Sequence, residues 1–331
     1  MSREYHESVS EGPIMIIHDR FGRPVKNLRI SVTSNCNLNC FYCHREGVYS
    51  FYHCYKELQR ARELSPNEIA RIVKIAVSFG VNSVKLTGGE PLIRRDILEI
   101  VKNISEIKEI RDLSLVTNGL LLESYAYNLK TSGLNRINVS LPTLNPEKYT
   151  WITGYKKKDG VEKIIRGIKK ALEADLNPVK VNMVVLRGVN DDEIPKLIDF
   201  ARETGAVLQL IELQDPNGFN SSFFKKYFYP LKQLEEKLEK EAKKVIIRDF
   251  QYRKRLFLDD VEIEIVRPMF NSNFCKYCKR LRVTSIGEFK PCLMRDDNHV
   301  DFSSYLNKPN EEENLRKLFI EAVRRREPFF K

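Results

Sequence analysis

The stretch from Leu28 to Cys43 reads Leu-Arg-Ile-Ser-Val-Thr-Ser-Asn-Cys-Asn-Leu-Asn-Cys-Phe-Tyr-Cys. Its first six residues carry Leu, Ile and Val, which predicts a short strand. Three cysteines follow, Cys36, Cys40 and Cys43, and they can converge on one site only if the chain curls around it as a loop. The asparagines around them favour such turns. The stretch therefore predicts a strand that ends in a metal-binding loop.

The seven cysteines of the chain divide into a group of three, the single Cys54, and a second group of three. An odd number in this arrangement is a poor disulfide framework, and clustered thiols in a reducing compartment indicate metal binding or catalysis. Thiolates select zinc or iron–sulfur centres. In the first group, His44 could complete a four-ligand zinc site, or three thiolates could hold an iron–sulfur cluster with one iron open to a substrate. The spacing alone leaves both open.

Short runs rich in Val, Ile and Leu alternate with amphipathic stretches from residue 27 onward. The runs predict six strands, Leu28–Thr33, Ser83–Thr87, Leu113–Thr117, Arg136–Leu141, Val179–Leu186 and Val207–Leu213. The stretches between them predict helices over Pro66–Phe79, Arg95–Ser105, Leu121–Thr131, Gly160–Ala174 and Asp191–Thr204. Serial βα repeats imply a parallel sheet with helices outside. Six repeats are too few for a standard barrel, so we expect an α/β fold with an incomplete (βα)6 barrel of the TIM type.

Active sites of such folds lie at the carboxyl ends of the strands. The polar and glycine residues expected at that edge are Thr33, Thr87-Gly88-Gly89, Thr117-Asn118-Gly119 and Ser140. Beyond residue 215 the pattern changes to a charged helix over Leu231–Lys244 and two hairpins, Leu256–Leu258 with Val261–Val266 and Arg280–Ser285 with Glu288–Pro291. The chain is thus predicted to contain an N-terminal segment (1–26), a partial barrel (27–214) and a small α+β extension (215–331).

This extension carries the second cysteine group, Cys275-x2-Cys278-x13-Cys292. It again offers three thiolates. A zinc ribbon would prefer two Cys-x-x-Cys pairs, and His299 is the nearest alternative fourth ligand.

Lysine and arginine (56) exceed aspartate and glutamate (45), which gives a formal charge of +11 and favours anionic partners. The basic residues are interleaved with glutamate, and Trp151 is the only tryptophan, so nothing indicates a stacking surface for nucleic acid. No apolar run approaches the length of a membrane span, and residues 1–12 do not resemble a signal peptide. We therefore expect a cytoplasmic protein without membrane or nucleic-acid partners.

The first cysteine group, with Tyr42 before its last cysteine, resembles the signature of the radical S-adenosylmethionine (SAM) superfamily. Thr87-Gly88-Gly89-Glu90-Pro91 resembles the element of that superfamily that holds the SAM amino group. Glycines allow close backbone approach there. The resemblance implies that Cys36, Cys40 and Cys43 hold a [4Fe–4S] cluster whose open iron binds SAM. It also implies that Tyr42, Gly88, Gly89, Glu90 and Ser140 contact SAM, which is cleaved to a 5′-deoxyadenosyl radical.

The second group and the run Cys278-Lys279-Arg280-Leu281-Arg282 resemble the family of GTP 3′,8-cyclases of molybdenum-cofactor biosynthesis. The family's motifs follow in order from Asp19-Arg20-Phe21-Gly22-Arg23 to Cys292. This resemblance implies a second [4Fe–4S] cluster on Cys275, Cys278 and Cys292. It implies GTP contacts from Arg29, Lys85, Lys180, Arg280, Leu281 and Arg282. Convergent cations are what a triphosphate requires.

The chain departs from this family at several positions. Lys85 and Gln209 stand where relatives have arginine, and Gln214 stands for a methionine that contacts SAM. The chain ends Phe329-Phe330-Lys331 instead of the family's Gly-Gly tail. We expect Cys54, His44 and His53 to be bystanders.

The resemblance implies conversion of GTP to 3′,8-cyclo-7,8-dihydro-GTP, because the radical removes the ribose 3′ hydrogen and C3′ then attacks C8 of guanine. It implies a reducing electron donor, a second-step cyclic pyranopterin monophosphate synthase downstream, and a possible homodimer. One alternative is another radical SAM enzyme with an auxiliary cluster, acting on a peptide or a different nucleotide. A second alternative is a basic iron–sulfur protein that binds RNA without turnover. Arg280 and Arg282 beside the second cluster favour the cyclase.

Overall fold

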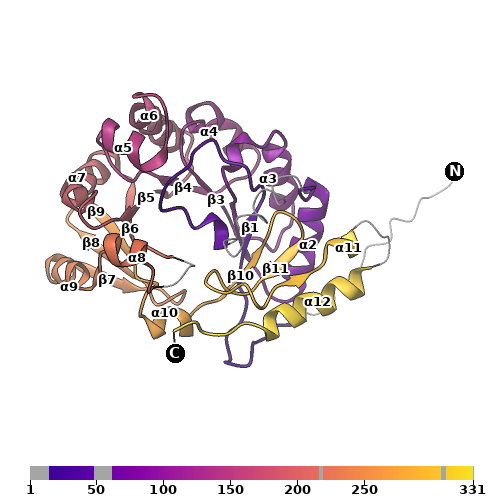
Figure 1. Cartoon of the computed structure of the whole chain (residues 1–331). Coiled ribbons are helices and arrows are strands. Elements are labelled where there is room, and N and C mark those ends of the chain that lie inside the picture. The colour runs from indigo at the N-terminus through magenta and orange to yellow at the C-terminus, as the bar shows by residue number, and fades with distance from the viewer. Residues whose placement is uncertain (1–14, 48–61, 216–218, 307–310, 331) are drawn as a thin grey trace.

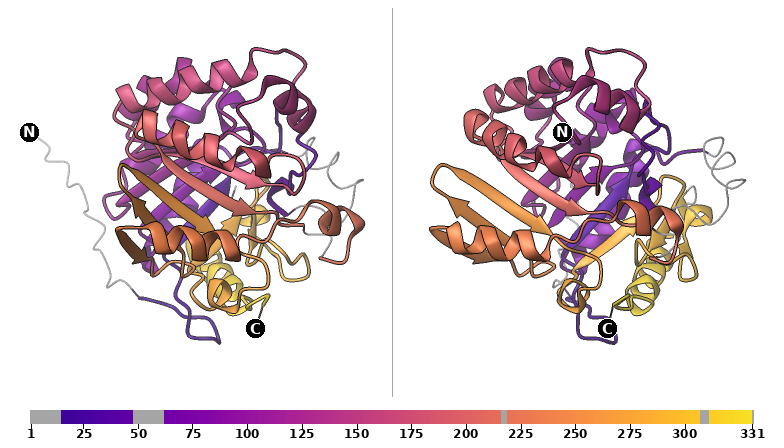
Figure 2. Two further views of the ribbon diagram at one scale, coloured as in Figure 1. Left: turned by 90° about the vertical axis from the view of Figure 1, so that its left-hand side faces the viewer. Right: turned by 60° about the vertical axis from the view of Figure 1, so that its left-hand side comes forward.

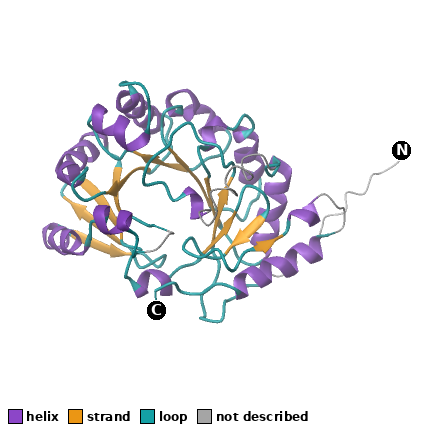
Figure 3. Cartoon of the chain, in the orientation of Figure 1, coloured by secondary structure: helices purple, strands orange, loops and turns teal. Residues whose placement is uncertain are grey.

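One sheet of twelve strands organises the described part of the chain, in the order β12-β11-β10-β1-β2-β3-β4-β5-β6-β9-β8-β7. The computed structural model describes residues 15–47, 62–215, 219–306 and 311–330. The strands lie inside and the helices mostly cover the outer side of the sheet (Figures 1 and 3). This arrangement confirms the predicted α/β class with a large parallel sheet.

The six predicted strands are confirmed at the centre of the sheet, each parallel to its neighbours. They are β1 (Asn27–Ser31), β2 (Ser83–Thr87), β3 (Asp112–Thr117), β4 (Arg136–Ser140), β5 (Val179–Val185) and β6 (Val207–Glu212). Their Leu, Ile and Val side chains form one core with the helices. The register places Arg29 opposite Lys85, so polar side chains of alternate positions share the inner face.

The helices between these strands begin and end close to the predicted positions. They are α2 (Pro66–Ser78), α3 (Ile97–Ser105), α4 (Leu122–Thr131), α5 (Pro146–Thr153), α6 (Gly160–Glu173) and α7 (Ile194–Thr204). Ser65 caps α2, with its hydroxyl accepting the N–H of Glu68 while the Glu68 carboxylate accepts the N–H of Ser65. Helix α5 was not predicted, and α7 is preceded by a separate 3-10 turn over Asp191–Glu193.

The C-terminal residues extend the same sheet at both ends, which the sequence did not predict. Strand β9 (Val261–Val266) lies parallel to β6, and β10 (Arg280–Val283) lies parallel to β1. The remaining elements are β7 (Lys244–Ile247), β8 (Lys254–Leu258), β11 (Glu288–Lys290), β12 (Val300–Asp301), α8 (Ser222–Tyr227), α9 (Lys232–Glu241), α10 (Ser272–Lys276), α11 (Ser303–Leu306) and α12 (Glu312–Arg324). Figure 2 shows the orange hairpin of β8 and β9 continuing the sheet beyond β6.

Two predictions for this region are therefore corrected. The parallel part of the sheet has eight strands among the described residues rather than six, because β9 and β10 join it. The charged helix ends at Glu241 rather than Lys244, because the β-branched residues that follow pair as β7 with β8. The domain boundaries at residues 26 and 214 remain predictions. None of the helices in the described ranges has the length and apolar character needed to cross a membrane.

Candidate active site

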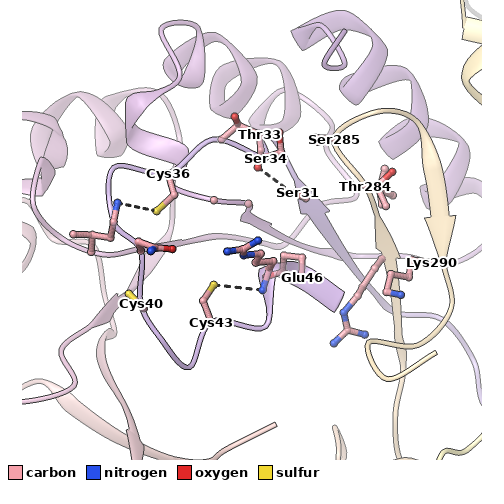
Figure 4. Close-up of a pocket in the computed structure, with 17 residues that line it drawn as sticks. Ser31, Thr33, Ser34, Cys36, Cys40, Cys43, Glu46, Thr284, Ser285 and Lys290 are labelled. Carbon is pink, nitrogen blue, oxygen red and sulfur yellow. Dashed lines mark hydrogen bonds between the residues drawn. The ribbon is translucent and has the colours of Figure 1, made fainter. Parts of the chain in front are cut away.

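The first cysteine loop follows β1 and borders a cavity of about 260 Å³. Cys36, Cys40 and Cys43 all line this cavity, as Figure 4 shows. The backbone N–H of Leu38 donates to Cys36 Sγ and that of Arg45 donates to Cys43 Sγ, each over 3.4 Å. Burial raises the pKa of Cys36 to about 11 and also raises the pKa values of Cys40 and Cys43. With pKa values raised in this way, the three thiols require a cationic centre to become thiolates.

These donors fit an iron–sulfur cluster better than one zinc ion. No three His, Cys, Asp or Glu side chains in the described ranges converge closely enough to hold a single metal ion. The three thiols instead surround one cavity, as a cluster of several atoms requires. The zinc alternative also loses its fourth ligand, because His44 Nδ1 accepts the backbone N–H of Glu46 at 3.1 Å. His53 and Cys54 lie outside the described residues.

Gly88 and Gly89, after β2, hold the cysteine loop in place. The N–H of Gly89 donates to the Thr33 carbonyl and that of Glu90 to the Asn35 carbonyl, both at 2.8 Å. A Cβ atom on Gly88 would lie 2.4 Å from the Thr33 oxygen, and one on Gly89 would lie 2.0 Å from the Asn35 oxygen. Only glycine permits this approach. The two glycines thus present bare backbone to the site.

Replacement of Gly89 by alanine is expected to displace the cysteine loop, because the new methyl group meets backbone atoms that cannot rotate away. We expect SAM binding to weaken by at least about tenfold, since a cost of 1.4 kcal/mol already gives that factor. Isothermal titration with SAM measures the loss. Gly188→Ala is the control, because nothing lies within 4 Å of a Cβ atom added at Gly188, so its methyl group meets no neighbour. Equal SAM affinity in both variants would contradict the prediction.

Glu90 joins the carboxyl ends of β2 and β3. Its carboxylate accepts the Thr117 hydroxyl at 2.6 Å, the Asn118 N–H at 2.7 Å and the Leu92 N–H at 3.0 Å. Burial outweighs these hydrogen bonds and raises the pKa of Glu90 to about 7. Glu90 thus ties β2 to the loop after β3 through three hydrogen bonds within the chain. Glu90 lines the cavity together with Gly88 and Gly89.

A larger cavity of about 680 Å³ lies on the inner face of the sheet and shares the cysteine loop. Its lining includes nearly all residues predicted to contact SAM or GTP, namely Arg29, Tyr42, Lys85, Gly88, Gly89, Glu90, Ser140, Lys180, Arg280 and Arg282. Gln209 and Gln214 line it as well. Leu281 is the exception: its side chain is fully buried in the core, so a contact with GTP from Leu281 would have to come from its backbone.

The second cysteine group lies beside this cavity, with Phe274 and Arg280 linking the two. Cys275, Cys278 and Cys292 are free thiols, and burial, with a smaller contribution from the nearby Cys292 and Cys278, raises the pKa of Cys275. Three nearby arginines, Arg326 foremost, outweigh burial and lower the pKa of Cys278. These arginines therefore stabilise its thiolate relative to an isolated thiol.

Residues from both ends of the described chain hold this second loop. Arg23 donates to the Cys275 carbonyl at 2.8 Å and pairs with Asp19 at 2.8 Å. Arg326, 1% exposed, donates to the Cys278 carbonyl. The Phe330 N–H donates to Cys275 Sγ at 3.4 Å. His299 instead contacts Lys290 Nζ at 3.0 Å and Glu288 at 3.3 Å, so it does not complete a zinc site.

Comparisons with known proteins agree with this geometry. Residues 30–201 match the family model described as Radical SAM superfamily. The chain belongs to the radical SAM superfamily. Residues 206–331 match a second family model, Molybdenum Cofactor Synthesis C. Radical SAM proteins use SAM together with a [4Fe–4S] cluster, and the two cysteine groups fit two clusters.

Two relatives that match nearly the whole of this chain bear the same name. A protein of Methanocaldococcus jannaschii is 47% identical over 95% of this chain and 99% of its own length, and one of Pyrococcus abyssi is 49% identical over 94% and 99%. Both are named "Probable GTP 3′,8-cyclase". Among solved structures, Streptococcus suis SuiB bound to S-adenosylmethionine is similar with a TM-score of 0.62 at 18% identity, over 91% of this chain and 68% of that one. That likeness shows a radical SAM fold.

The larger cavity, of about 680 Å³, is strongly cationic. Within the described ranges its lining has ten lysines and arginines against five aspartates and glutamates. Arg29 is paired with Glu46 at 2.6 Å and also donates to Thr87 at 3.1 Å. Lys85 donates to Asn138 at 2.7 Å, and burial with surrounding cations holds its pKa well below the usual range. This excess of positive charge suits a polyanionic substrate.

The sequence analysis did not predict several charged residues that line the larger cavity. Arg136 lines the cavity and is held by Asp112 at 2.6 Å. Arg248 and Arg253 line it from the turn between β7 and β8, and Glu264 lies behind them. Two arginines on either side of the aromatic Phe250 could have indicated an anion-binding turn. The turn was not connected with the site because it lies more than twenty residues from either cysteine group in the sequence.

Glu212, at the end of β6, makes stability depend on pH. Burial raises its pKa from an ordinary value of 4.5 to about 7, although the N–H groups of Leu231 and Met269 donate to it. Because the pKa of Glu212 is higher in the folded state than in the unfolded state, the stability that protonated Glu212 contributes is fully present below pH 4.5. This contribution is lost as the pH rises toward 7. Relative to Glu212→Gln, the wild type should lose on the order of 2 kcal/mol across this window. Urea unfolding at a series of pH values tests this, and a constant difference would contradict it.

Proposed function

We propose that the protein is a GTP 3′,8-cyclase, which converts GTP to (8S)-3′,8-cyclo-7,8-dihydroguanosine 5′-triphosphate in the first step of molybdopterin synthesis. The observation that carries the proposal is one cationic cavity that the first cysteine group lines, and that Phe274, Lys279 and Arg280, the sequence neighbours of Cys275 and Cys278, line as well. Relatives of the same length bearing that name support it, as does the Molybdenum Cofactor Synthesis C region.

The residues divide into two sets. Cys36, Cys40 and Cys43 would hold the first [4Fe–4S] cluster, with Gly88 and Gly89 allowing the backbone of the cysteine loop to pack against them. When bound, reduced cluster and SAM supply a 5′-deoxyadenosyl radical. Tyr42 and Ser140 line the same cavity, where they would contact SAM.

Cys275, Cys278 and Cys292 would hold the second cluster, and the cations of the inner face would bind GTP. Arg280 and Arg282 lie on β10 next to β1, so their side chains reach the same cavity as Arg29 and Lys85. Arginine can grip phosphate oxygens through two N–H groups at once. The chain thereby orients the ribose and excludes water, while the difficult chemistry belongs to the cofactors.

GTP labelled with deuterium at C3′ tests the function. The protein is reconstituted anaerobically with iron and sulfide, reduced with dithionite and mixed with SAM and the labelled GTP. We expect deuterium in 5′-deoxyadenosine, read by mass spectrometry, together with the cyclised nucleotide. SAM cleavage that ignores GTP would overturn the cyclase and favour another radical SAM reaction on a peptide or different nucleotide.

We further propose a cytoplasmic location, because six described thiols are free and clusters of this kind need a reducing compartment. A reducing electron donor and a downstream cyclic pyranopterin monophosphate synthase are the expected partners, and a homodimer is the expected assembly.

A further inference from the structure

The turn between β7 and β8, residues 248–253, brings two arginines into the cavity. Arg248 and Arg253 line it, and the Arg248 N–H donates to the Arg253 carbonyl at 2.8 Å, which closes the turn. The Gln251 N–H donates to the Tyr277 carbonyl at 2.9 Å, and Asp249 pairs with Lys279. The turn is therefore fixed to the loop that carries the second cysteine group.

Both arginines share one buried carboxylate. Glu264 on β9 is fully buried, lies 3.2 Å from Arg248 and 3.3 Å from Arg253, and also pairs with Lys180. These cations hold the pKa of Glu264 well below its usual range, so it is ionised. One negative charge faces three positive ones. Burying such an excess is costly unless an anion completes it.

The arginines also retain donors for that anion. The Arg253 side chain is only 11% exposed, yet its Nε has no hydrogen-bond partner among the described residues. Arg248 is one-third exposed, and its Nη1 donates to Glu264 at 3.2 Å. Phe250 lies under both Arg253 and Arg280, with guanidinium carbons 5.1 and 4.8 Å from its ring centre. The ring fixes the two guanidiniums on one wall of the cavity.

The neighbouring strand contributes no charge opposite Glu264. Gln209 on β6 pairs directly with Glu264 on β9 and lines the cavity as a neutral amide. The turn supplies cations beside this neutral position. We infer that Arg248 and Arg253 bind the phosphate chain of the substrate, with Glu264 as the residue that positions them. This inference rests on the proposed function and names the part of GTP that the turn recognises.

Equilibrium binding of GTP and of guanosine tests the inference. Reconstituted protein without reductant is titrated with each ligand, so that no turnover occurs. For Arg248→Gln and Arg253→Gln we expect GTP affinity to fall by about tenfold each, as loss of a charge-assisted hydrogen bond predicts. Guanosine affinity should stay unchanged, because guanosine carries no phosphate. Arg255→Gln on β8 is the matched control, since Arg255 pairs with Glu262 and is absent from the cavity lining.

The outcomes separate the inference from the function. If the wild type prefers GTP to guanosine and both variants keep that preference, the inference is wrong while the cyclase stands. If guanosine affinity falls as much as GTP affinity, the arginines are structural, which also overturns it. If the wild type binds guanosine as tightly as GTP, the cavity does not recognise a phosphate chain. That result would overturn the inference and contradict the proposed GTP substrate.

Discussion

Replacement of Cys40 by alanine is expected to reduce SAM cleavage to the background seen without reductant. Cys40 lies in the loop whose three thiols border one cavity. The two cysteines that remain cannot hold a cluster that requires three cysteine ligands. Iron content should fall by half, because the second group is untouched. Measurement of 5′-deoxyadenosine after anaerobic reconstitution gives the result directly.

Cys278→Ala is the matched control for this experiment. The second group lies beside the larger cavity and does not line the one around the first. Iron content should fall by the same half, yet SAM should still be cleaved while no cyclised nucleotide forms. If Cys278→Ala stopped SAM cleavage as completely as Cys40→Ala, the division of labour between the two groups would be refuted.

Glu264→Gln on β9 should cause a large loss of stability. Three cations, Lys180, Arg248 and Arg253, depend on this fully buried carboxylate. Removing the one charge that balances buried cations costs about 3–5 kcal/mol of unfolding free energy. Lysine can release its proton to relieve the repulsion, but arginine cannot. Denaturant unfolding of the whole chain measures the difference.

Glu262→Gln on the same strand is its control. Glu262 makes a two-pronged ion pair with Arg255, at 2.6 and 2.7 Å, but that pair is partly open to solvent. Such pairs contribute about 1 kcal/mol or less. Similar losses for the two glutamines would show that Glu264 does not balance a buried excess of charge.

Local sequence determined the centre of this protein. The runs of Val, Ile and Leu predicted six strands because strands covered on both faces must be apolar along their length. Ser65 and Glu68 marked the start of α2 because a helix terminus needs side chains for its free N–H groups. The cysteine spacing and the paired glycines predicted a metal-binding loop beside a strand end, since both features act within a few residues.

Tertiary structure alone decided what completes the site. The pairing of β10 with β1 and of β9 with β6 joins segments more than fifty residues apart in the chain, and no local pattern specifies which strand edges meet. That pairing brings Arg248 and Arg253 to the cavity and removes the Leu281 side chain from it. The sequence shows which charges exist. Only packing determines which of them share a buried carboxylate and which face the substrate, because burial and distance set the strength of each charge.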